Sequence, residues 1–157
     1  MDLNLIMSVA SELRKSGKKI AVAESLTSGL IQNYLGSASG SSQYFMGGLT
    51  CYSMESKIRI LGVPEEFVLE NEAVNPQVAI AMAQNVASLF NADIGIGTTG
   101  FAEASRLTSI PYAYFCVALP GRTCLAEKIA GPELARNDMR MKVAERALLD
   151  LVEALRS

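Results

Sequence analysis

The chain has 157 residues, enough for one domain with a full hydrophobic core, and its length gives no reason to expect two. Half of the residues are apolar, 19% are charged and the net charge is −2, so the composition is that of a globular protein and lacks the basic stripe of a nucleic-acid-binding surface. No histidine is present, which excludes serine–histidine–aspartate hydrolases, and without clustered cysteines a transition-metal site is not expected.

No segment predicts contact with a membrane. The apolar runs are far shorter than the roughly 20 residues that span a bilayer, and the start of the chain lacks the pattern of a signal peptide. We therefore expect a cytoplasmic protein. The three cysteines, Cys51, Cys116 and Cys124, fit this expectation, since their number is odd, no Cys-x-x-Cys occurs, and each lies in an apolar, strand-like stretch. They are predicted to be small buried side chains.

Hydrophobic periodicity and turn residues predict alternating helices and strands. In chain order we expect a helix over residues 3–13 with a stop at Gly17, a strand over 19–23, a helix over 27–35, a loop over 37–42, a strand over 47–53, a helix over 54–61 with further helical turns over 64–69, a helix over 76–90, a strand over 93–97, a polar loop over 99–110, strands over 112–119 and 124–130, and a last helix over 135–155.

The order of these elements predicts an α/β fold with helices on both faces of a mixed sheet. Residues 120–123, Pro-Gly-Arg-Thr, predict a hairpin, so the last two strands add antiparallel partners to an α/β start. No internal repeat or linker is visible. We expect one domain over residues 1–157.

Polar residues follow three of the predicted strands, within residues 24–29, 52–57 and 98–101. Ligands of open α/β sheets bind beyond the carboxyl ends of strands, so these segments are the candidate site. Ser25 follows the apolar run 20–23, where the N-terminus of the next helix would favour a developing negative charge. Ser25 is therefore a candidate nucleophile. The alternative is that it only caps this helix.

A base for Ser25 must be a lysine, a carboxylate or a tyrosinate, because histidine is absent. Lys57 follows Tyr52 by five residues, close to a strand end. Burial there would lower the pKa of the lysine toward neutrality, and a tyrosine hydroxyl between a serine and a lysine can relay a proton. The alternatives are a solvated lysine and a tyrosine at the edge of the core.

The run Ala23-Glu24-Ser25-Leu26-Thr27-Ser28-Gly29-Leu30 resembles the A-E-S-C-T-G-G-L segment of the CinA C-terminal domain family, whose characterised members are nicotinamide-nucleotide amidases. The resemblance extends from about residue 3 to 155. Its further matches, in chain order, are Gly40-Ser41-Ser42 with Phe45 and Gly47-Gly48, Thr50-Cys51-Tyr52-Ser53 with Lys57, Leu61-Gly62-Val63, Ala73-Val74, Thr99-Gly100, and the pair Arg136 and Arg140.

This resemblance implies a three-layer α/β/α sandwich that hydrolyses nicotinamide mononucleotide to nicotinic acid mononucleotide and ammonia, without a metal or cofactor. Ser25 would be the nucleophile, Lys57 the base, and Tyr52 would assist the proton transfer. Backbone N–H groups near Leu26 and Thr27 would form an oxyanion hole. The residues expected to bind the substrate are Leu26, Thr27, Gly29, Ser42, Thr99, Gly100, Arg136 and Arg140.

One of the two arginines would hold the substrate's phosphate, because a guanidinium suits bidentate phosphate binding. The alternative is that both arginines belong to a solvated helix face. The expected partner is a small nucleotide, with no nucleic acid and no membrane. The long amphipathic last helix also allows a homodimer. Since the chain begins near the start of the family's domain, we expect a stand-alone form.

Three departures from the family's pattern bear on activity. Leu26 replaces a cysteine, and Ser28 replaces a glycine, although serine adopts positive φ less readily. Residues 101–107 replace a glycine-rich loop, and Glu103 adds a negative charge where a nucleotide would bind unless Arg106 offsets it. Two hypotheses follow: an amidohydrolase, or a degenerate paralogue that binds a nucleotide-like ligand or a protein partner without turnover.

Overall fold

The computed structural model describes residues 2–122, 124–131 and 134–157, and its centre is a mixed five-stranded sheet in the order β2-β1-β3-β4-β5. β1 pairs in parallel with β2 and β3, and the antiparallel strands β4 and β5 complete the other edge. The strands are β1 (Ile20–Glu24), β2 (Phe45–Thr50), β3 (Ile94–Phe101), β4 (Tyr112–Ala118) and β5 (Ala126–Ala130).

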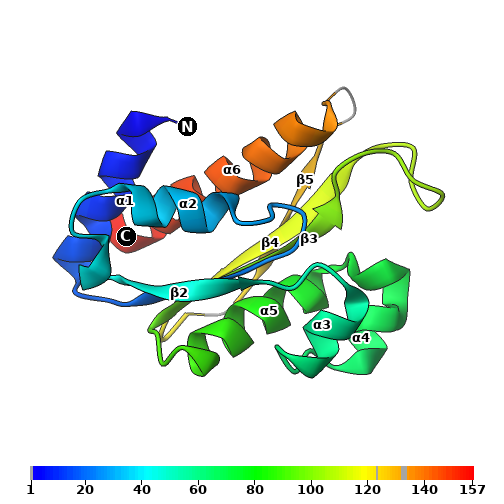
Figure 1. Ribbon diagram of the computed structural model, residues 1–157, viewed down its shortest axis with the longest axis horizontal. Coiled ribbons are helices and arrows are strands. Elements are labelled where there is room, and N and C mark those ends of the chain that lie inside the picture. Colours follow the sequence, from blue (N-terminus) through cyan, green and yellow to red (C-terminus); the bar gives the residue numbers. More distant parts are fainter. Residues whose placement is uncertain (1, 123, 132–133) are drawn as a thin grey trace.

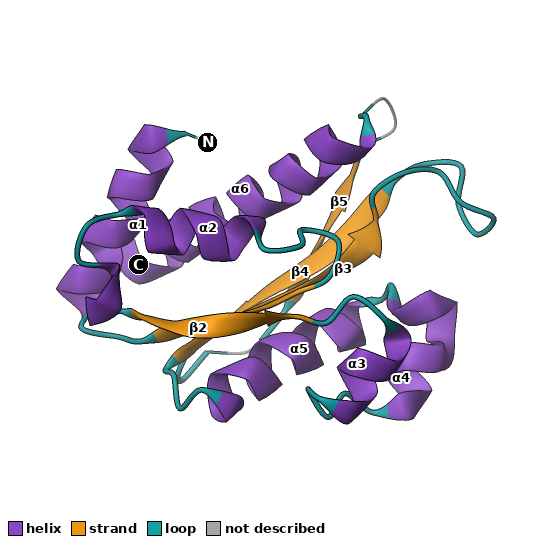
Figure 2. Ribbon diagram, viewed as in Figure 1, coloured by secondary structure: helices purple, strands orange, loops and turns teal. Residues whose placement is uncertain are grey.

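Helices cover both faces of this sheet, as Figures 1 and 2 show, so the three-layer α/β/α sandwich expected from the sequence is confirmed. α1, α2 and α6 lie on one face, and α3, α4 and α5 lie on the other (Figure 1). The α-helices are α1 (Leu3–Ser16), α2 (Leu30–Ser37), α3 (Met54–Arg59), α4 (Glu65–Leu69), α5 (Pro76–Leu89) and α6 (Arg136–Arg156), and the 3-10 turns are η1 (Ser41–Gln43) and η2 (Glu70–Ala73).

Each face of β1 contributes to a different hydrophobic cluster. Ile20 and Val22 pack with α1, α2 and α6, whereas Ala21 and Ala23 pack with α5 and the segment around α3 and α4. Every residue of β1 is buried, as expected for a central strand covered on both faces. The end of β1 is thereby fixed between both helical layers.

Three element boundaries differ from the sequence prediction. α2 begins at Leu30 instead of residue 27, so Thr27 and Ser28 belong to a turn. β2 is displaced toward the N-terminus and ends at Thr50, which places Tyr52 beyond the strand. β3 extends to Phe101, because its last residues pair with β4 as far as Phe101 opposite Tyr112.

The β4–β5 hairpin is present, with a connection longer than the predicted residues 120–123; of these, Thr123 lies outside the described residues. All three cysteines are free. Cys51 and Cys116 are buried, but Cys124 is only partly buried, and Cys51 and Cys124 lie outside the strands. In the described part of the chain, every helix is too short or too polar to cross a membrane.

Candidate active site

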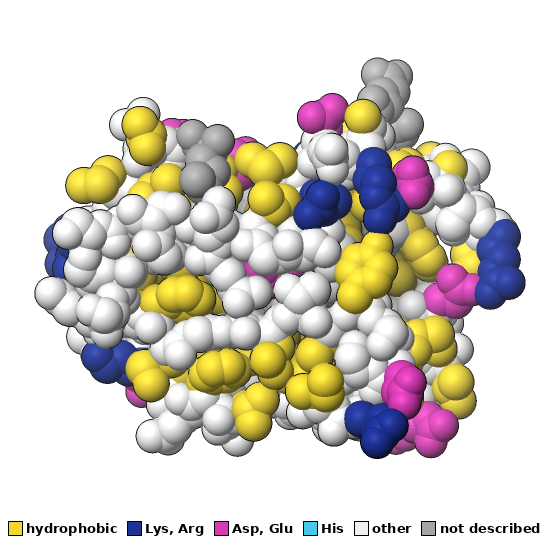
Figure 3. Space-filling view, in the orientation of Figure 1, with side chains coloured by type: hydrophobic (Ala, Val, Ile, Leu, Met, Phe, Trp, Pro, Cys, Tyr) yellow, Lys and Arg dark blue, Asp and Glu magenta, His cyan; other side chains and the backbone are white. Residues whose placement is uncertain are grey.

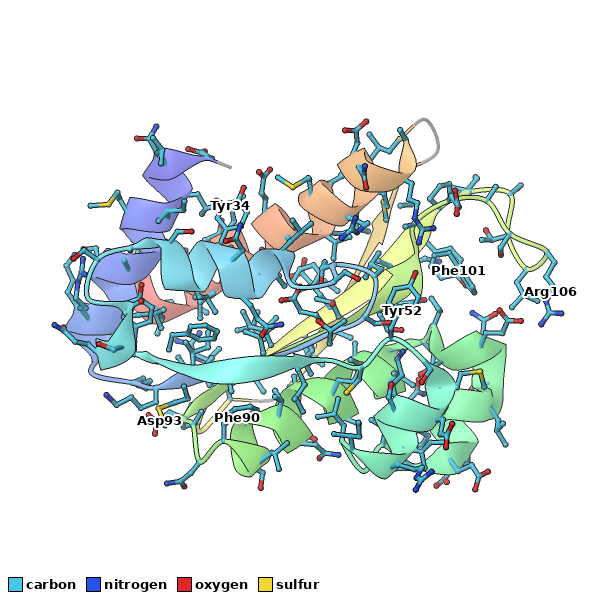
Figure 4. All side chains as sticks on the ribbon, in the orientation of Figure 1. Tyr34, Tyr52, Phe90, Asp93, Phe101 and Arg106 are labelled. Carbon is cyan, nitrogen blue, oxygen red and sulfur yellow. The ribbon has the colours of Figure 1, made fainter. Side chains whose placement is uncertain are left out.

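A cavity of about 300 Å³ opens at the carboxyl ends of β1 and β3. The turn after β1, the segment around α3, η2, the end of β3 with the loop that follows it, and the first turn of α6 all contribute lining residues. Figure 4 labels Tyr52 and Phe101, which both line the cavity, and Arg106 farther out on the loop after β3. Of the sequence-predicted residues, those that line the cavity are Ser25, Leu26, Tyr52, Lys57, Thr99, Gly100 and Arg136.

Ser25 and Lys57 meet at the floor of this cavity. The Lys57 Nζ lies 2.9 Å from the Ser25 Oγ, and the two residues are only 3% and 7% exposed, respectively. The same Nζ donates to the backbone carbonyls of Cys51 at 3.0 Å and Tyr52 at 3.1 Å. Each of its three possible hydrogen bonds thus has an acceptor, which explains how the amine tolerates burial.

Burial lowers the pKa of Lys57 from its ordinary value of 10.5 to about 8, since the charged form loses its hydration. At a pH near 8 a large fraction of the amine is therefore neutral and holds a free lone pair. A neutral amine 2.9 Å from a serine hydroxyl can accept its proton. The geometry and the pKa together suit a serine–lysine nucleophile.

The carboxylate of Glu24, rather than Ser25, caps α2. Glu24 is fully buried, and its oxygens accept from the backbone N–H groups of Gly29 at 2.9 Å, Ile31 at 3.3 Å and Gln32 at 2.9 Å. The expected stabilisation of charge on Ser25 by this helix end is therefore wrong, because the helix starts five residues later and its free N–H groups are already bonded. Ser25 is likewise not a helix cap.

Hydrogen bonds to the Thr98 side chain connect the Ser25 turn to β3. The Thr98 Oγ1 accepts the Ser25 backbone N–H at 3.3 Å and lies 2.9 Å from the Thr27 Oγ1. Among the described residues, the N–H groups of Leu26 and Thr27 have no hydrogen-bond partner. They are therefore the available donors for an oxyanion formed at Ser25.

The two arginines of α6 occupy different places. The guanidinium of Arg140 donates to the backbone carbonyls of Leu26 at 2.8 Å and Thr27 at 3.3 Å, so it stabilises the turn that carries Ser25. Arg136 lines the cavity instead. The third guanidinium nitrogen of Arg140 donates to the Asn137 side chain at 3.0 Å, so Arg140, proposed from the sequence as a phosphate ligand, is bonded to the protein itself.

The hydroxyl of Tyr52 is not placed between Ser25 and Lys57. Tyr52 is exposed, and its hydroxyl accepts from Arg136 at 2.8 Å, while only its backbone carbonyl contacts Lys57. The expected proton relay through this hydroxyl is therefore not seen. The reason is that Tyr52 lies beyond β2, where its side chain points to the mouth of the cavity rather than to the floor.

Besides Arg140, three more residues predicted to bind the substrate lie away from the cavity. Ser42 is exposed in η1, before the start of β2, and so lies at the opposite end of the sheet. Thr27 is fully buried against Thr98, and the N–H of Gly29 is bonded to Glu24. Within this chain, none of the three lines the cavity.

The loop that replaces the expected glycines brings charged side chains to the cavity mouth. Glu103 forms an ion pair with Arg136 at 2.5 Å, and Arg106 forms one with Glu72 of η2. The sequence left open whether Arg106 offsets the charge of Glu103. In the structure Glu103 is paired with Arg136 instead, and Arg106 is paired with Glu72. Figure 3 shows acidic and basic side chains next to one another in this part of the face.

Two residues important to the site were not assigned a role from the sequence. Glu24 was recognisable only as an acid at a strand end, because the N–H groups from which it accepts lie five to eight residues later in the chain. Thr98 was expected at a strand end but lies inside β3.

In the described residues, no group of three or more His, Cys, Asp or Glu side chains could hold a metal ion.

A family model described as "CinA C-terminal domain" matches residues 2–155. A CinA-like protein from Syntrophomonas wolfei is 40% identical over 117 residues, which cover 73% of this chain and 28% of that protein. This chain spans about a third or less of the length of the curated relatives that it matches.

Two solved structures have the same fold. The competence or damage-inducible protein from Enterobacter asburiae is 27% identical, with a TM-score of 0.84 over 96% of each chain. The competence/damage inducible protein from Agrobacterium tumefaciens is 24% identical, with a TM-score of 0.88 over the full length of both chains. At the latter identity the likeness concerns the fold alone.

Proposed function

Because this chain belongs to the CinA C-terminal domain family, we propose that it is an amidohydrolase that cleaves the carboxamide of nicotinamide mononucleotide or a related small amide. The observation that carries this proposal is the 2.9 Å contact between the buried Lys57 Nζ and the Ser25 Oγ. A buried amine whose pKa is lowered to about 8 has little structural purpose beside a serine hydroxyl unless it exchanges a proton with it.

In the proposed reaction, the Ser25 Oγ attacks the carboxamide carbon while Lys57 accepts the hydroxyl proton. The N–H groups of Leu26 and Thr27 stabilise the negative oxygen of the tetrahedral intermediate. Lys57 then returns the proton to the departing nitrogen, which leaves as ammonia, and an ester on Ser25 remains. Water hydrolyses this ester with Lys57 again as the base, giving a carboxylic acid and free Ser25.

The test is an ammonia-release assay with nicotinamide mononucleotide on the wild type and on Ser25→Ala and Lys57→Met. We expect each variant to lose at least about 1,000-fold in kcat, as is typical when a nucleophile or its base is removed. Wild-type activity should rise with pH through about 8, because only the neutral form of Lys57 accepts a proton. Matched controls are Ser88→Ala and Lys15→Met, which change exposed residues far from the cavity.

A second candidate function, ligand binding without turnover, is favoured by the loop at residues 101–107, where Glu103 already occupies Arg136. If the wild type releases no ammonia between pH 6 and 10, yet a nucleotide raises its thermal midpoint, the protein is a binder instead of a hydrolase. Activity that survives in Ser25→Ala would contradict the proposed nucleophile.

A further inference from the structure

We propose that Glu103 competes with anionic ligand groups for Arg136, so that the cavity takes an uncharged or cationic carboxamide in preference to one that carries a phosphate. That the bound carboxamide is hydrolysed rests on the proposed function, but the preference in binding does not. The acid and its partner lie on different elements, the loop after β3 and the first turn of α6, and both line the cavity.

Arg136 is already engaged on two sides. One nitrogen of its guanidinium lies 2.5 Å from the Glu103 carboxylate, and another donates to the Tyr52 hydroxyl at 2.8 Å. An incoming phosphate can form a bidentate pair with this arginine only by displacing the carboxylate. The displaced acid would then remain near the phosphate on the same short loop, where two negative charges repel each other.

The other positive charges near the cavity cannot take over this role. Lys57 is buried, and its three hydrogen bonds go to Ser25 and to two backbone carbonyls. Arg106 is paired with Glu72, and it does not line the cavity, whereas Glu72 does. Among the described residues, the lining therefore offers two carboxylates, one paired arginine and one buried amine.

Such a lining favours an uncharged or cationic ligand over an anionic one. A cationic ring, such as the pyridinium of a nicotinamide nucleoside, makes no demand on Arg136 and can lie beside Glu72 and Glu103 without displacing these carboxylates from their arginines. Ribose hydroxyls can donate to the same carboxylates. We infer that the preferred ligand is a nicotinamide nucleoside without its phosphate, or a small amide of similar charge.

The strength of this selection is modest, because the pair is partly exposed. The side chains of Arg136 and Glu103 are 46% and 61% exposed, so solvent and salt screen their interaction. We therefore expect a change of about tenfold in relative affinity, rather than an absolute block.

The experiment compares nicotinamide mononucleotide with nicotinamide riboside, which share the pyridinium carboxamide and differ only in the phosphate. Equilibrium dissociation constants are measured by calorimetry in a Ser25→Ala background, so that no turnover occurs. The wild-type loop should bind the riboside more tightly. Glu103→Gln should raise the relative affinity for the mononucleotide about tenfold, and Glu103→Lys should raise it further, since a second cation then lies beside Arg136.

The matched control is Glu55→Gln, which removes the acid of another exposed glutamate–arginine pair, Glu55 with Arg59, outside the cavity. It should leave the ratio of the two affinities unchanged. Ammonia release from both ligands is measured in parallel with Ser25 present. If neither ligand releases ammonia but the affinity ratio shifts as expected, the proposed reaction fails and the binding preference stands.

Two results would overturn the inference. One is that the wild type prefers the mononucleotide and that the ratio of the two affinities changes by less than about twofold in Glu103→Gln and Glu103→Lys. The other is binding of neither ligand by any variant, because the inference assigns this class of ligand to the cavity.

Discussion

Lys57 can serve as a base beside Ser25 only because of where the chain buries it. An exposed lysine is protonated at neutral pH and has no lone pair to accept a proton. Here the loss of hydration lowers the pKa to about 8, while two backbone carbonyls and the Ser25 hydroxyl supply hydrogen bonds that keep the amine in place. Burial thus determines both the position of the Lys57 amine and its lowered pKa.

Arg136 and Arg140 illustrate how neighbouring residues of one helix divide their tasks. They are four apart and so lie on the same side of α6. Arg140 points to the turn carbonyls of Leu26 and Thr27, whereas Arg136, one turn earlier, extends to the mouth of the cavity. The sequence predicted that the pair belongs to the site, but it could not show that Arg140 stabilises the turn and that Arg136 lines the cavity.

Ser28 carries a local strain that a glycine would relieve. Its φ is 49°, in the left-handed region, where a side chain costs roughly 1–2 kcal/mol. Ser28→Gly should therefore raise the free energy of unfolding by about 1 kcal/mol, after allowing for the greater freedom of glycine in the unfolded chain. Urea denaturation at neutral pH measures this change.

The control for Ser28→Gly is Ser88→Gly, the same substitution in the right-handed helix α5. It should lower the free energy of unfolding by roughly 0.5–1 kcal/mol. A decrease in Ser28→Gly as well would mean that the hydroxyl contact with the Ser25 carbonyl, 3.5 Å away, outweighs the backbone strain.

At the scale of elements, α5 and β3 approach each other unusually closely. A Cβ added at Gly97 would lie 2.3 Å from the Ala79 carbonyl oxygen, and one added at Gly95 would lie 1.8 Å from that of Ala83. Both obstacles are helix backbone, which cannot swing aside as a side chain can. The glycines of β3 therefore set the distance between this helix and the strand that carries Thr98.

Gly97→Ala should consequently destabilise the protein by at least about 2 kcal/mol, because helix and strand must move apart within a packed core. Chemical denaturation gives the change in the free energy of unfolding. The matched control is Gly36→Ala in α2, where the nearest atom to an added Cβ is 4.0 Å away and a gain of roughly 0.5–1 kcal/mol is expected from helix propensity. Equal effects of the two substitutions would contradict the close packing.

Element types were more predictable from the sequence than element ends. The strongly periodic helices could be predicted from their apolar faces, and the β4–β5 hairpin from the turn residues 120–123 between two strand-like stretches. The start of α2 could not, since Glu24 caps it from eight residues before Gln32, and a cap of that span leaves no short motif. The end of β3 was missed because the sequence predicted Thr98 at the end of a strand and Thr99 at the start of a polar loop, although pairing with β4 keeps both in the sheet.

At the scale of the whole molecule, the sheet gathers segments that are distant in sequence around one cavity. The parallel strands β1 and β2 end on the same edge, which brings Lys57 to Ser25 across 32 residues, and α6 supplies Arg136 from the far end of the chain. The Ser25–Lys57 contact could be anticipated because it follows from parallel topology. The pairing of Glu103 with Arg136 could not, since a charged loop has several possible partners and no periodicity to choose among them.

The burial of Lys57 also makes the stability of the whole protein depend on pH. Its pKa is about 8 in the folded state and about 10.4 in an unfolded chain. Between these values the unfolded chain binds the proton and the folded protein does not, so a rise in pH favours the folded state. Below pH 8 both states are protonated, and the cost of burying the charge is present in full.

The measurement is the free energy of unfolding of the wild type and of Lys57→Met at pH 7, 8, 9 and 10, by urea denaturation. As the pH rises from 7 to 10, the free energy of unfolding of the wild type should increase relative to that of Lys57→Met by an amount on the order of 3 kcal/mol. The reason is that each unit of difference between the folded and unfolded pKa corresponds to about 1.4 kcal/mol. Groups that titrate equally in both proteins cancel. Lys15→Met, at an exposed lysine, should differ from the wild type by a constant amount. Parallel curves for Lys57→Met would mean that the amine keeps an ordinary pKa, and Lys57 would then be too fully protonated near neutral pH to act as the base for Ser25.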